Sequence, residues 1–226
     1  MRSLLKKFYS RKSVFDPTNN FSRIPQQLIE KFSGKKILNI GAGNEPLGDK
    51  VITIDRFTQA DIRADACSLP VKTGSVDLAL CIAVLEHLPE PAAAVAEIAR
   101  ILKPNGEVYI EIPFLQPYHE SPGDYFRATR QGLEYWCRDF QKVGSGVCVG
   151  PGSAVAWLEI EYVKLWFGRI PILGLLAELL FRACFLPLKF LDQFLIGNPE
   201  AHITASAIYF HGKKVLKTIP RNPHER

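Results

Sequence analysis

The chain has 226 residues, 47% of them apolar, and is therefore long enough to bury one sizeable hydrophobic core. Its net charge of +5 is concentrated at the ends: residues 1–36 hold nine Lys and Arg against two acids, and residues 213–226 hold five against one. The middle is therefore acidic, which excludes a generally basic nucleic-acid-binding face. The two ends are either solvated tails or a basic rim suited to an anionic membrane or an acidic substrate.

The five cysteines form no CxxC pair and have no matched histidine spacing. We therefore expect neither a bound metal nor a disulfide framework, and a cytoplasmic location. Near the start, Leu4, Leu5 and Phe8 are interrupted by Lys6 and Lys7. This pattern lacks the apolar stretch of a secretory signal, so export is not expected.

Strand and helix patterns alternate along the chain and predict an α/β fold with a doubly wound, mostly parallel, seven-stranded Rossmann-like sheet. A helical insertion is expected between strands six and seven. The expected parts are a basic helical leader (1–34), the Rossmann-like domain (35–150), an apolar amphipathic insertion (151–203), the last strand of the domain (204–212) and a basic tail (213–226). The expected elements, in chain order, are a helix at 25–32, strands at 36–40, 51–55, 60–66 and 75–81, a helix at 91–102, a strand at 107–112, a helix at 129–138, and strands at 143–149 and 204–211.

A turn with two glycines, Gly41 and Gly43, follows the first strand, and the second strand ends on Asp55. Glycine lets the backbone approach a ligand closely, and a carboxylate at this place can accept hydrogen bonds from a ribose diol. Asp55 lies only twelve positions after Gly43, and the residues between them include Pro46, so we predict a loop over 44–50. Without a helix N-terminus there, a pyrophosphate lacks its usual site. The spacing therefore disfavours an NAD-dependent oxidoreductase and favours a nucleoside without phosphates, such as S-adenosylmethionine.

Five linked motifs in this order resemble the class I S-adenosylmethionine-dependent methyltransferases, specifically a type 11-like subset with a shortened first crossover. They cover about residues 35–115. Within that subset, the short loop weakly suggests enzymes that modify sugars or the cell envelope. The motifs are Leu38-Asn39-Ile40-Gly41-Ala42-Gly43 with Asp55, Ala64-Asp65-Ala66 with Leu69-Pro70, Ser75-Val76-Asp77-Leu78, Leu85-Glu86-His87-Leu88, and Leu102-Lys103-Pro104-Asn105-Gly106.

The resemblance implies where S-adenosylmethionine binds. It places the glycine turn under the methionine part, Asp55 on the ribose hydroxyls, and Asp65 with Ala66 at the adenine amino group. We also expect Ile82, just after the fourth strand, at the cofactor. Asn39 stands where the family usually has an acid, so it keeps a hydrogen bond but brings no charge to the methionine ammonium.

The segment 113–129 follows the fifth strand, at the sheet edge where such folds bind substrate. His119 is the candidate general base, because a neutral imidazole accepts a proton near pH 7. Tyr125 is a further catalytic candidate, and Tyr118, Asp124 and Arg127 are candidates for orienting substrate. The alternative is that this loop only caps the sheet, with Asp124 and Arg127 paired to each other.

His87, in the Glu86-His87 pair after the fourth strand, is the third catalytic candidate. In the resembling family this histidine more often fixes the turn than takes part in chemistry. We expect Thr129 to cap the helix that follows.

The insertion has two expected helical parts. Ser153 is expected to cap a helix that runs to Phe167, and Pro187 to kink the helix over 178–196. No uncharged run there exceeds eight residues, so a membrane span is not expected. The polar residues of the second part fall in one narrow sector of a helix, and the rest is apolar. That face is suited to a membrane surface, a lid over the site or a homodimer interface through 152–197.

The sequence thus predicts a class I methyltransferase that uses S-adenosylmethionine to methylate a small-molecule, glycan or lipid-linked acceptor, most simply on oxygen. No nucleic acid partner is expected, whereas peripheral contact with an anionic membrane is. The alternative is a catalytically inactive cofactor-binding module that docks at a membrane or in a complex.

Overall fold

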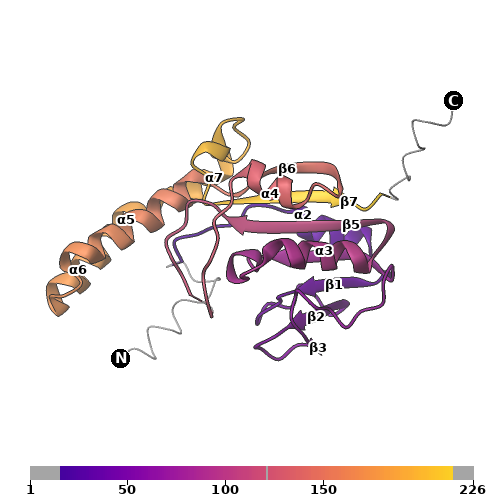
Figure 1. Cartoon of the computed structure of the whole chain (residues 1–226). Coiled ribbons are helices and arrows are strands. Elements are labelled where there is room, and N and C mark those ends of the chain that lie inside the picture. Colours follow the sequence, from indigo (N-terminus) through magenta and orange to yellow (C-terminus); the bar gives the residue numbers. More distant parts are fainter. Residues whose placement is uncertain (1–15, 121, 216–226) are drawn as a thin grey trace, which may run out of the picture.

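The computed structural model describes residues 16–120 and 122–215. The basic N-terminal run up to residue 15 and the tail beyond 215 lie outside the described residues. A single sheet with the strand order β3-β2-β1-β4-β5-β7-β6 forms the centre of the protein (Figure 1). The strands are β1 (Ile37–Ile40), β2 (Val51–Asp55), β3 (Ile62–Arg63), β4 (Val76–Ile82), β5 (Leu102–Pro113), β6 (Gln141–Val149) and β7 (Ala207–Lys213).

Only β7 runs against its neighbours: it pairs antiparallel with β5 and β6, while β1, β2, β3, β4 and β5 pair in parallel. The predicted mostly parallel, seven-stranded fold is therefore confirmed. The third strand is shorter than the expected 60–66, because the chain turns at Asp65, which bridges to Ser68. Residues 41–50, all of them described, form turns and loop rather than a helix, as the spacing between Gly43 and Asp55 predicted.

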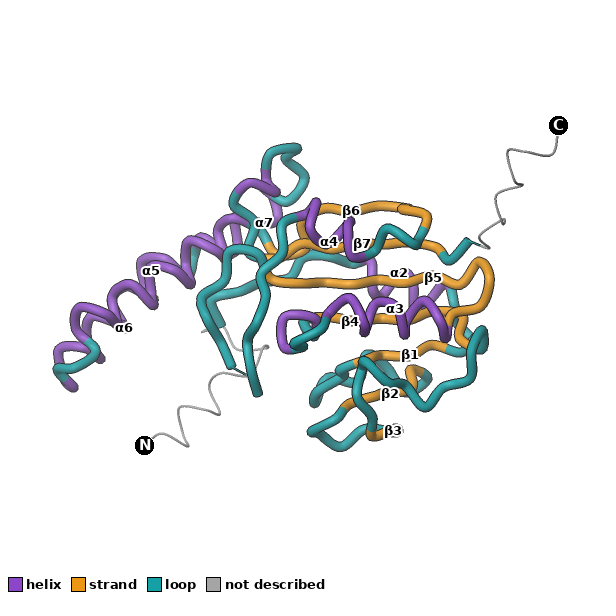
Figure 2. The backbone as a smooth tube through the Cα atoms, viewed as in Figure 1, coloured by secondary structure: helices purple, strands orange, loops and turns teal. Residues whose placement is uncertain are grey.

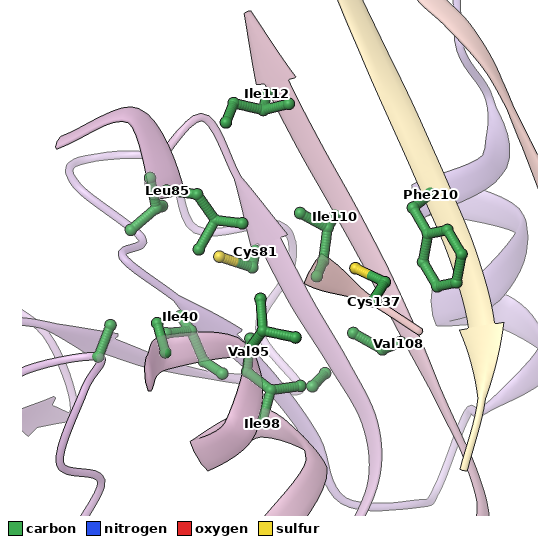
Figure 3. Close-up of a cluster of buried hydrophobic side chains, with 14 of the residues drawn as sticks. Ile40, Cys81, Leu85, Val95, Ile98, Val108, Ile110, Ile112, Cys137 and Phe210 are labelled. Carbon is green, nitrogen blue, oxygen red and sulfur yellow. The ribbon is translucent and has the colours of Figure 1, made fainter. Parts of the chain in front are cut away.

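Helices cover both faces of the sheet because alternate strand residues point to opposite sides. On one face, α3 (Pro91–Ile101) and α4 (Arg130–Trp136) cover a large core that includes Ile98, Cys81 and Phe210 (Figure 3). On the other, α2 (Ile24–Lys31) packs through Leu28 on a smaller cluster that includes Tyr109. The helix expected in the leader is therefore part of this second layer.

Two local features were predicted correctly and one was not. The Thr129 hydroxyl caps α4 by accepting a hydrogen bond from Gly132 N. Pro187 separates the second part of the insertion into α6 (Pro171–Phe185) and α7 (Leu188–Leu195). The expectation that Ser153 caps the helix before them was wrong, because α5 (Pro151–Phe167) begins two residues earlier.

The group that actually caps α5 is Asp192, from α7. Its buried carboxylate accepts hydrogen bonds from Gly152 N at 2.7 Å, Ser153 N at 3.0 Å and the Ser153 hydroxyl at 2.6 Å. A carboxylate at a helix N-terminus satisfies amide groups that have no partner within the helix. Asp192 thereby fixes α7 against the start of α5, and the whole insertion depends on it.

The residues before α2 run across the same place. Asn19 N donates to the Ser153 hydroxyl at 3.1 Å, and Asn20 bridges to Val149 at the end of β6. The Lys189 ammonium donates to the carbonyl oxygen of Asp16. The segment 16–20 therefore crosses the base of the insertion and is called the strap.

We expect Asp192→Ala to lower the free energy of unfolding by about 2 kcal/mol or more, because two buried N–H groups lose their acceptor. Urea unfolding followed by circular dichroism measures the loss. The matched control is Gln193→Ala on the exposed side of the same helix, which should change stability little. Equal stability of the two variants would show that Asp192 does not hold the insertion.

Candidate functional site

A cleft of about 800 Å³ opens at the carboxyl ends of the parallel strands. Its walls come from the loops after β1, β2, β3 and β4 and from the segment after β5. Ligands in open α/β sheets bind at this edge, where neighbouring strands diverge to opposite sides. The cleft is lined by every residue predicted to contact the cofactor and by all three catalytic candidates: Asn39, Gly41, Gly43, Asp55, Asp65, Ala66, Ile82, His87, His119 and Tyr125.

The glycine turn after β1 needs glycine at two places for different reasons. Gly41 has a φ of +68°, and a Cβ there would lie 2.3 Å from a methyl carbon of Val84. Gly43 has a φ of +55°, but no protein atom lies within 4 Å of the place its Cβ would take. Gly41 is thus required by packing, whereas Gly43 leaves open space that belongs to the cleft.

Asp55 binds this turn to the end of β2. Its carboxylate accepts hydrogen bonds from Gly43 N at 2.9 Å, Phe57 N at 2.7 Å and Thr58 N at 2.8 Å. Burial alone would raise the pKa of Asp55, but these backbone donors outweigh it and leave the pKa below its ordinary value. Asp55 therefore stays ionised and holds both loops in place.

Two other predicted cofactor residues also support the walls. The Asn39 amide is buried and donates to the carbonyl oxygen of Glu45 at 3.2 Å, which fixes the far side of the glycine turn. Asp65 accepts from Cys67 N at 2.9 Å and forms an ion pair with Arg56 at 2.7 Å. These contacts orient both side chains without removing them from the cleft.

His87 and His119 lie together at one end of the cleft, with ring centroids 5.4 Å apart. Nδ1 of His87 is 2.5 Å from the carbonyl oxygen of Gly123, and Nδ1 of His119 is 3.0 Å from that of Pro117. A carbonyl oxygen only accepts hydrogen bonds, so the contact with Gly123 assigns a proton to Nδ1 of His87. Nδ1 of His119 also lies 3.2 Å from a guanidinium nitrogen of Arg127, which only donates, so the contacts of His119 fit either tautomer.

The pKa of His119 lies below its ordinary value. Burial is the main cause; the contact with Pro117 opposes it, and the nearby Arg127 guanidinium adds to it. The neutral imidazole of His119 therefore prevails at neutral pH and is able to accept a proton.

Asp124 and Arg127 pair with each other, as the alternative interpretation of this loop has it. Asp124 also accepts from His119 N at 2.8 Å, and Arg127 donates to the carbonyl oxygen of Pro117 at 2.9 Å. Burial raises the pKa of Asp124, but the Arg127 guanidinium and the His119 amide outweigh this effect and lower the pKa to about 2. Since both side chains are occupied in building the loop that carries His119, they position this histidine rather than face a ligand.

The two tyrosines of this loop differ. The Tyr118 hydroxyl donates to Glu120 and its ring is exposed. Tyr125 donates through its backbone N–H to the carbonyl oxygen of Glu86 at 2.7 Å, and its ring lines the cleft while remaining 57% exposed. Tyr125 therefore stays at the entrance, whereas His87 and His119 lie deeper.

A second cleft of about 600 Å³ lies beside the first, between the sheet edge, the strap and the insertion. Its walls include the Glu86 and Glu111 side chains from the sheet edge and Trp157 from α5. Among the described residues, the two clefts share only Ile82, Ala83 and His119. Trp157 lies against His119, with ring centroids 5.5 Å apart. His119 is thus the titratable side chain at the junction of the two clefts.

Comparisons with known proteins agree with this architecture. A family model described as a methyltransferase domain, Methyltransf_11, matches residues 47–110. A ubiquinone biosynthesis O-methyltransferase of Pseudomonas aeruginosa is 25% identical over 193 residues, covering 70% of this chain and 81% of that protein. One from Azotobacter vinelandii is 25% identical over 192 residues, covering 69% and 77%. Residues 47–110 thus match a methyltransferase domain family, and these matches support the resemblance of the chain to the class I S-adenosylmethionine-dependent methyltransferases.

Solved structures with the same fold include the [4+2]-cyclase SpnF, with a TM-score of 0.53 at 17% identity over 86% of this chain and 80% of that one. A phosphoethanolamine N-methyltransferase of Haemonchus contortus in complex with S-adenosyl-L-methionine has a TM-score of 0.50 at 15% identity, over 95% and 60%. At such identities the likeness concerns the fold alone. The protein is an enzyme of this methyltransferase class, and S-adenosylmethionine is its cofactor.

The structure of this methyltransferase also shows site residues that the sequence reasoning missed. Phe57 lines the first cleft directly after Asp55 and is 63% exposed, so its ring is accessible to a ligand there. Its place after the acid that ends β2 was the available signal. Ala83 has a φ of +54°, a strained conformation for alanine, at the junction of the clefts. No sequence pattern marks that strain.

Glu86 and Glu111 were not assigned a role either. Both are buried and both line the second cleft. Glu111 accepts from the Tyr109 hydroxyl at 2.6 Å and from the Asn20 amide at 2.9 Å. One donor atom each from Glu86, His87 and His119 lie within 4.8 Å of one another, a spacing that a divalent cation also fits.

We expect Gly43→Ala to weaken S-adenosylmethionine binding at least about tenfold, because the added methyl group enters the first cleft. Its positive φ should also lower stability by about 1–2 kcal/mol. Gly74→Ala is the matched control: Gly74 has a φ of +62°, equally open surroundings and no place in either cleft. Calorimetric titration should show weakened binding for the first variant alone. Equal affinities would mean that the cofactor does not approach Gly43.

Proposed function

We propose that S-adenosylmethionine lies in the first cleft with the roles that the family resemblance assigned. The ribose hydroxyls donate to Asp55, the adenine amino group faces Asp65 and Ala66, and Phe57 packs on the adenine ring. The methionine part lies over Gly41 and Gly43 beside Asn39, and Ile82 lies near the sulfonium. The support is that these residues surround one cavity at the strand ends.

We propose that the second cleft holds the methyl acceptor and that the accepting atom is an oxygen. The curated relatives are named as O-methyltransferases. The buried carboxylates Glu86 and Glu111 suit an acceptor that offers hydroxyl groups, because carboxylates accept hydrogen bonds. Trp157 and Ile160 give the same cleft an apolar wall. An amphiphilic small molecule, a glycan or a lipid-linked hydroxyl compound has both features.

The observation that carries this proposal is the place of His119 at the junction of the clefts. Its Nε2 takes the proton of the acceptor hydroxyl, and the oxygen forms a bond to the methyl carbon. The carbon–sulfur bond breaks with its electrons staying on sulfur, which gives a methyl ether and neutral S-adenosylhomocysteine. The imidazolium then releases its proton to water. Holding the two reactants in line contributes most, and a base contributes roughly 10²–10⁴-fold.

His87 and Tyr125 have supporting roles in this proposal. His87 packs edge-on against His119 and keeps its ring in place. Tyr125 covers the entrance of the cofactor cleft. Since all five cysteines are free thiols in the structure, we also propose a reducing, cytoplasmic environment for the enzyme.

We expect His119→Asn to lower kcat/KM about 100-fold or more while leaving S-adenosylmethionine affinity unchanged. Asparagine keeps a donor for the Pro117 carbonyl oxygen but cannot take up a proton. The assay follows methyl transfer from labelled S-adenosylmethionine to a catechol, a methyl glycoside and a prenylated phenol. The matched control is His202→Asn, which also removes a histidine with Nδ1 near a backbone carbonyl, 2.9 Å from Pro199, but outside both clefts.

The outcomes separate three interpretations. Full activity in His119→Asn contradicts the base, and activity that a chelator abolishes assigns the Glu86, His87 and His119 group to a metal instead. Cofactor binding without product from any acceptor favours the alternative of a catalytically inactive module that docks at a membrane or in a complex.

The pH dependence of kcat/KM should also report His119. Because its pKa is lowered, the neutral form prevails at neutral pH, and kcat/KM should stay level there and fall only as the pH drops below about 6.5. In His119→Asn this acid limb should disappear. An acid limb that persists in the variant would place the titrating group elsewhere.

A further inference from the structure

The outer surface of α6 and α7 is almost entirely apolar. Between residues 171 and 195, all of which the structure describes, the charged residues are Glu178, Arg182, Lys189 and Asp192. Arg182, Lys189 and Asp192 are buried, and Glu178 is largely covered. A surface helix normally turns its charges to water and its apolar stripe to the core. This pair of helices does the opposite.

The inward charges are held by specific partners. Asp192 caps α5, and Lys189 donates to the strap at Asp16. Arg182 pairs with Glu178 at 2.8 Å, and Lys164 of α5 lies 3.9 Å from the same glutamate. Turning the helices over to hide the apolar side would break all of these contacts. The exposed apolar face is therefore built into the packing of the insertion.

α5 also carries exposed apolar side chains along its length. α5 and α6 pack against each other, and Figures 1 and 2 show them projecting beyond the edge of the sheet. The 17 residues of α5 correspond to a length of about 25 Å at 1.5 Å per residue. The exposed apolar residues of the three helices, which we name the apolar face, are Val155, Leu158, Tyr162, Leu165, Trp166, Ile172, Leu173, Leu175, Leu176, Leu179, Leu180, Phe190, Leu191, Phe194 and Leu195.

The N-terminal run joins the chain next to this face. The described chain begins at Asp16, whose carbonyl oxygen contacts Lys189 of α7. The fifteen residues before it contain Arg2, Lys6, Lys7, Arg11 and Lys12 and no Asp or Glu. A basic segment is thus tethered at the base of the apolar face.

We propose that the apolar face docks on the surface of an anionic lipid bilayer. Stable attachment to a membrane generally needs two signals, and an apolar surface beside a basic segment provides both. By length and composition, the stretch from Pro171 to Leu195 is also long and apolar enough to cross a membrane, which was not expected from the sequence, and only 11% of an 18-residue apolar window within it is buried. Crossing would strip the inward charges of their partners, so the insertion lies in the interface instead.

Docking in this way would bring the second cleft to the membrane. Trp157, Ile160 and Arg182 line that cleft from the base of the insertion. If the proposed function holds, the acceptor is a hydroxylated lipid or lipid-linked compound that enters from the bilayer surface. This last step rests on the proposed function, whereas the docking itself does not.

The test is flotation of the full chain with vesicles of phosphatidylcholine, with and without phosphatidylglycerol, at low and at high salt. We expect binding to the vesicles with phosphatidylglycerol, weaker at high salt. Leu176→Asp with Leu180→Asp places two charges at positions 59% and 60% exposed and should reduce vesicle binding at least about tenfold. The matched control, Tyr135→Asp with Val143→Asp, changes exposed apolar residues away from the insertion and should bind vesicles normally.

Calorimetric titration with S-adenosylmethionine accompanies both variants and should show unchanged affinity, which proves that they fold and keeps this test separate from the proposed function. The proposal is overturned if the protein binds vesicles at neither the low nor the high salt concentration. So does equal vesicle binding by the two double variants. A different outcome is that the unmodified chain forms a dimer and does not bind vesicles, while Leu176→Asp with Leu180→Asp is a monomer. That result would assign the apolar face to an interface with a second copy of this chain.

Discussion

The carboxylate of Asp55 connects the parts of the protein on which the cofactor site depends. The chain between β1 and β2 is too short for the crossover helix that usually supports a glycine turn. Instead, Asp55 receives N–H groups from Gly43 on one side and from Phe57 and Thr58 on the other. Because these donors also lower the pKa of Asp55, its carboxylate is charged at physiological pH. One ionised side chain thus replaces a secondary-structure element.

The junction of the two clefts likewise depends on a few side-chain and backbone contacts. The Asp124 and Arg127 pair contributes to the loop that carries His119, and backbone carbonyls hold Nδ1 of both histidines. Ala83 is held in a left-handed conformation between the clefts. Such strain persists only where surrounding contacts determine it, and here the end of β4 is anchored by Ala83 N donating to the Glu111 carbonyl oxygen at 3.1 Å. Ala83 thus lies in the wall that the two clefts share.

In the helical insertion, the polar stripe of the helices faces the interior of the protein. A narrow set of charges on α6 and α7 caps α5, pairs along α6 and holds the strap. Once those charges are committed to the interior, the leucines and phenylalanines on the remaining sides have no protein surface to cover. The exposed apolar face is the direct consequence.

The sequence by itself determined the mostly parallel seven-stranded sheet and the loop in place of the first helix, and the family resemblance pointed to residues that line the first cleft. Strand alternation, glycines and the spacing from Gly43 to Asp55 are local signals, and they depend only on neighbours in the chain. The tertiary structure decided which polar side chains bind other parts of the protein and are therefore not available to a ligand. Asp124, Arg127 and Ser153 were expected to orient substrate or cap a helix, yet their partners are a histidine loop and an aspartate nearly forty residues away.

The same reason explains Ala83, Glu86 and Glu111, to which the sequence assigned no role. Their importance comes from a cavity whose walls are brought together from strands, a strap and an insertion that are far apart in sequence. It also explains the orientation of α6 and α7, since the helical pattern revealed a polar stripe but not the direction it faces. Direction is set by what lies against the helix, and only the folded chain supplies that.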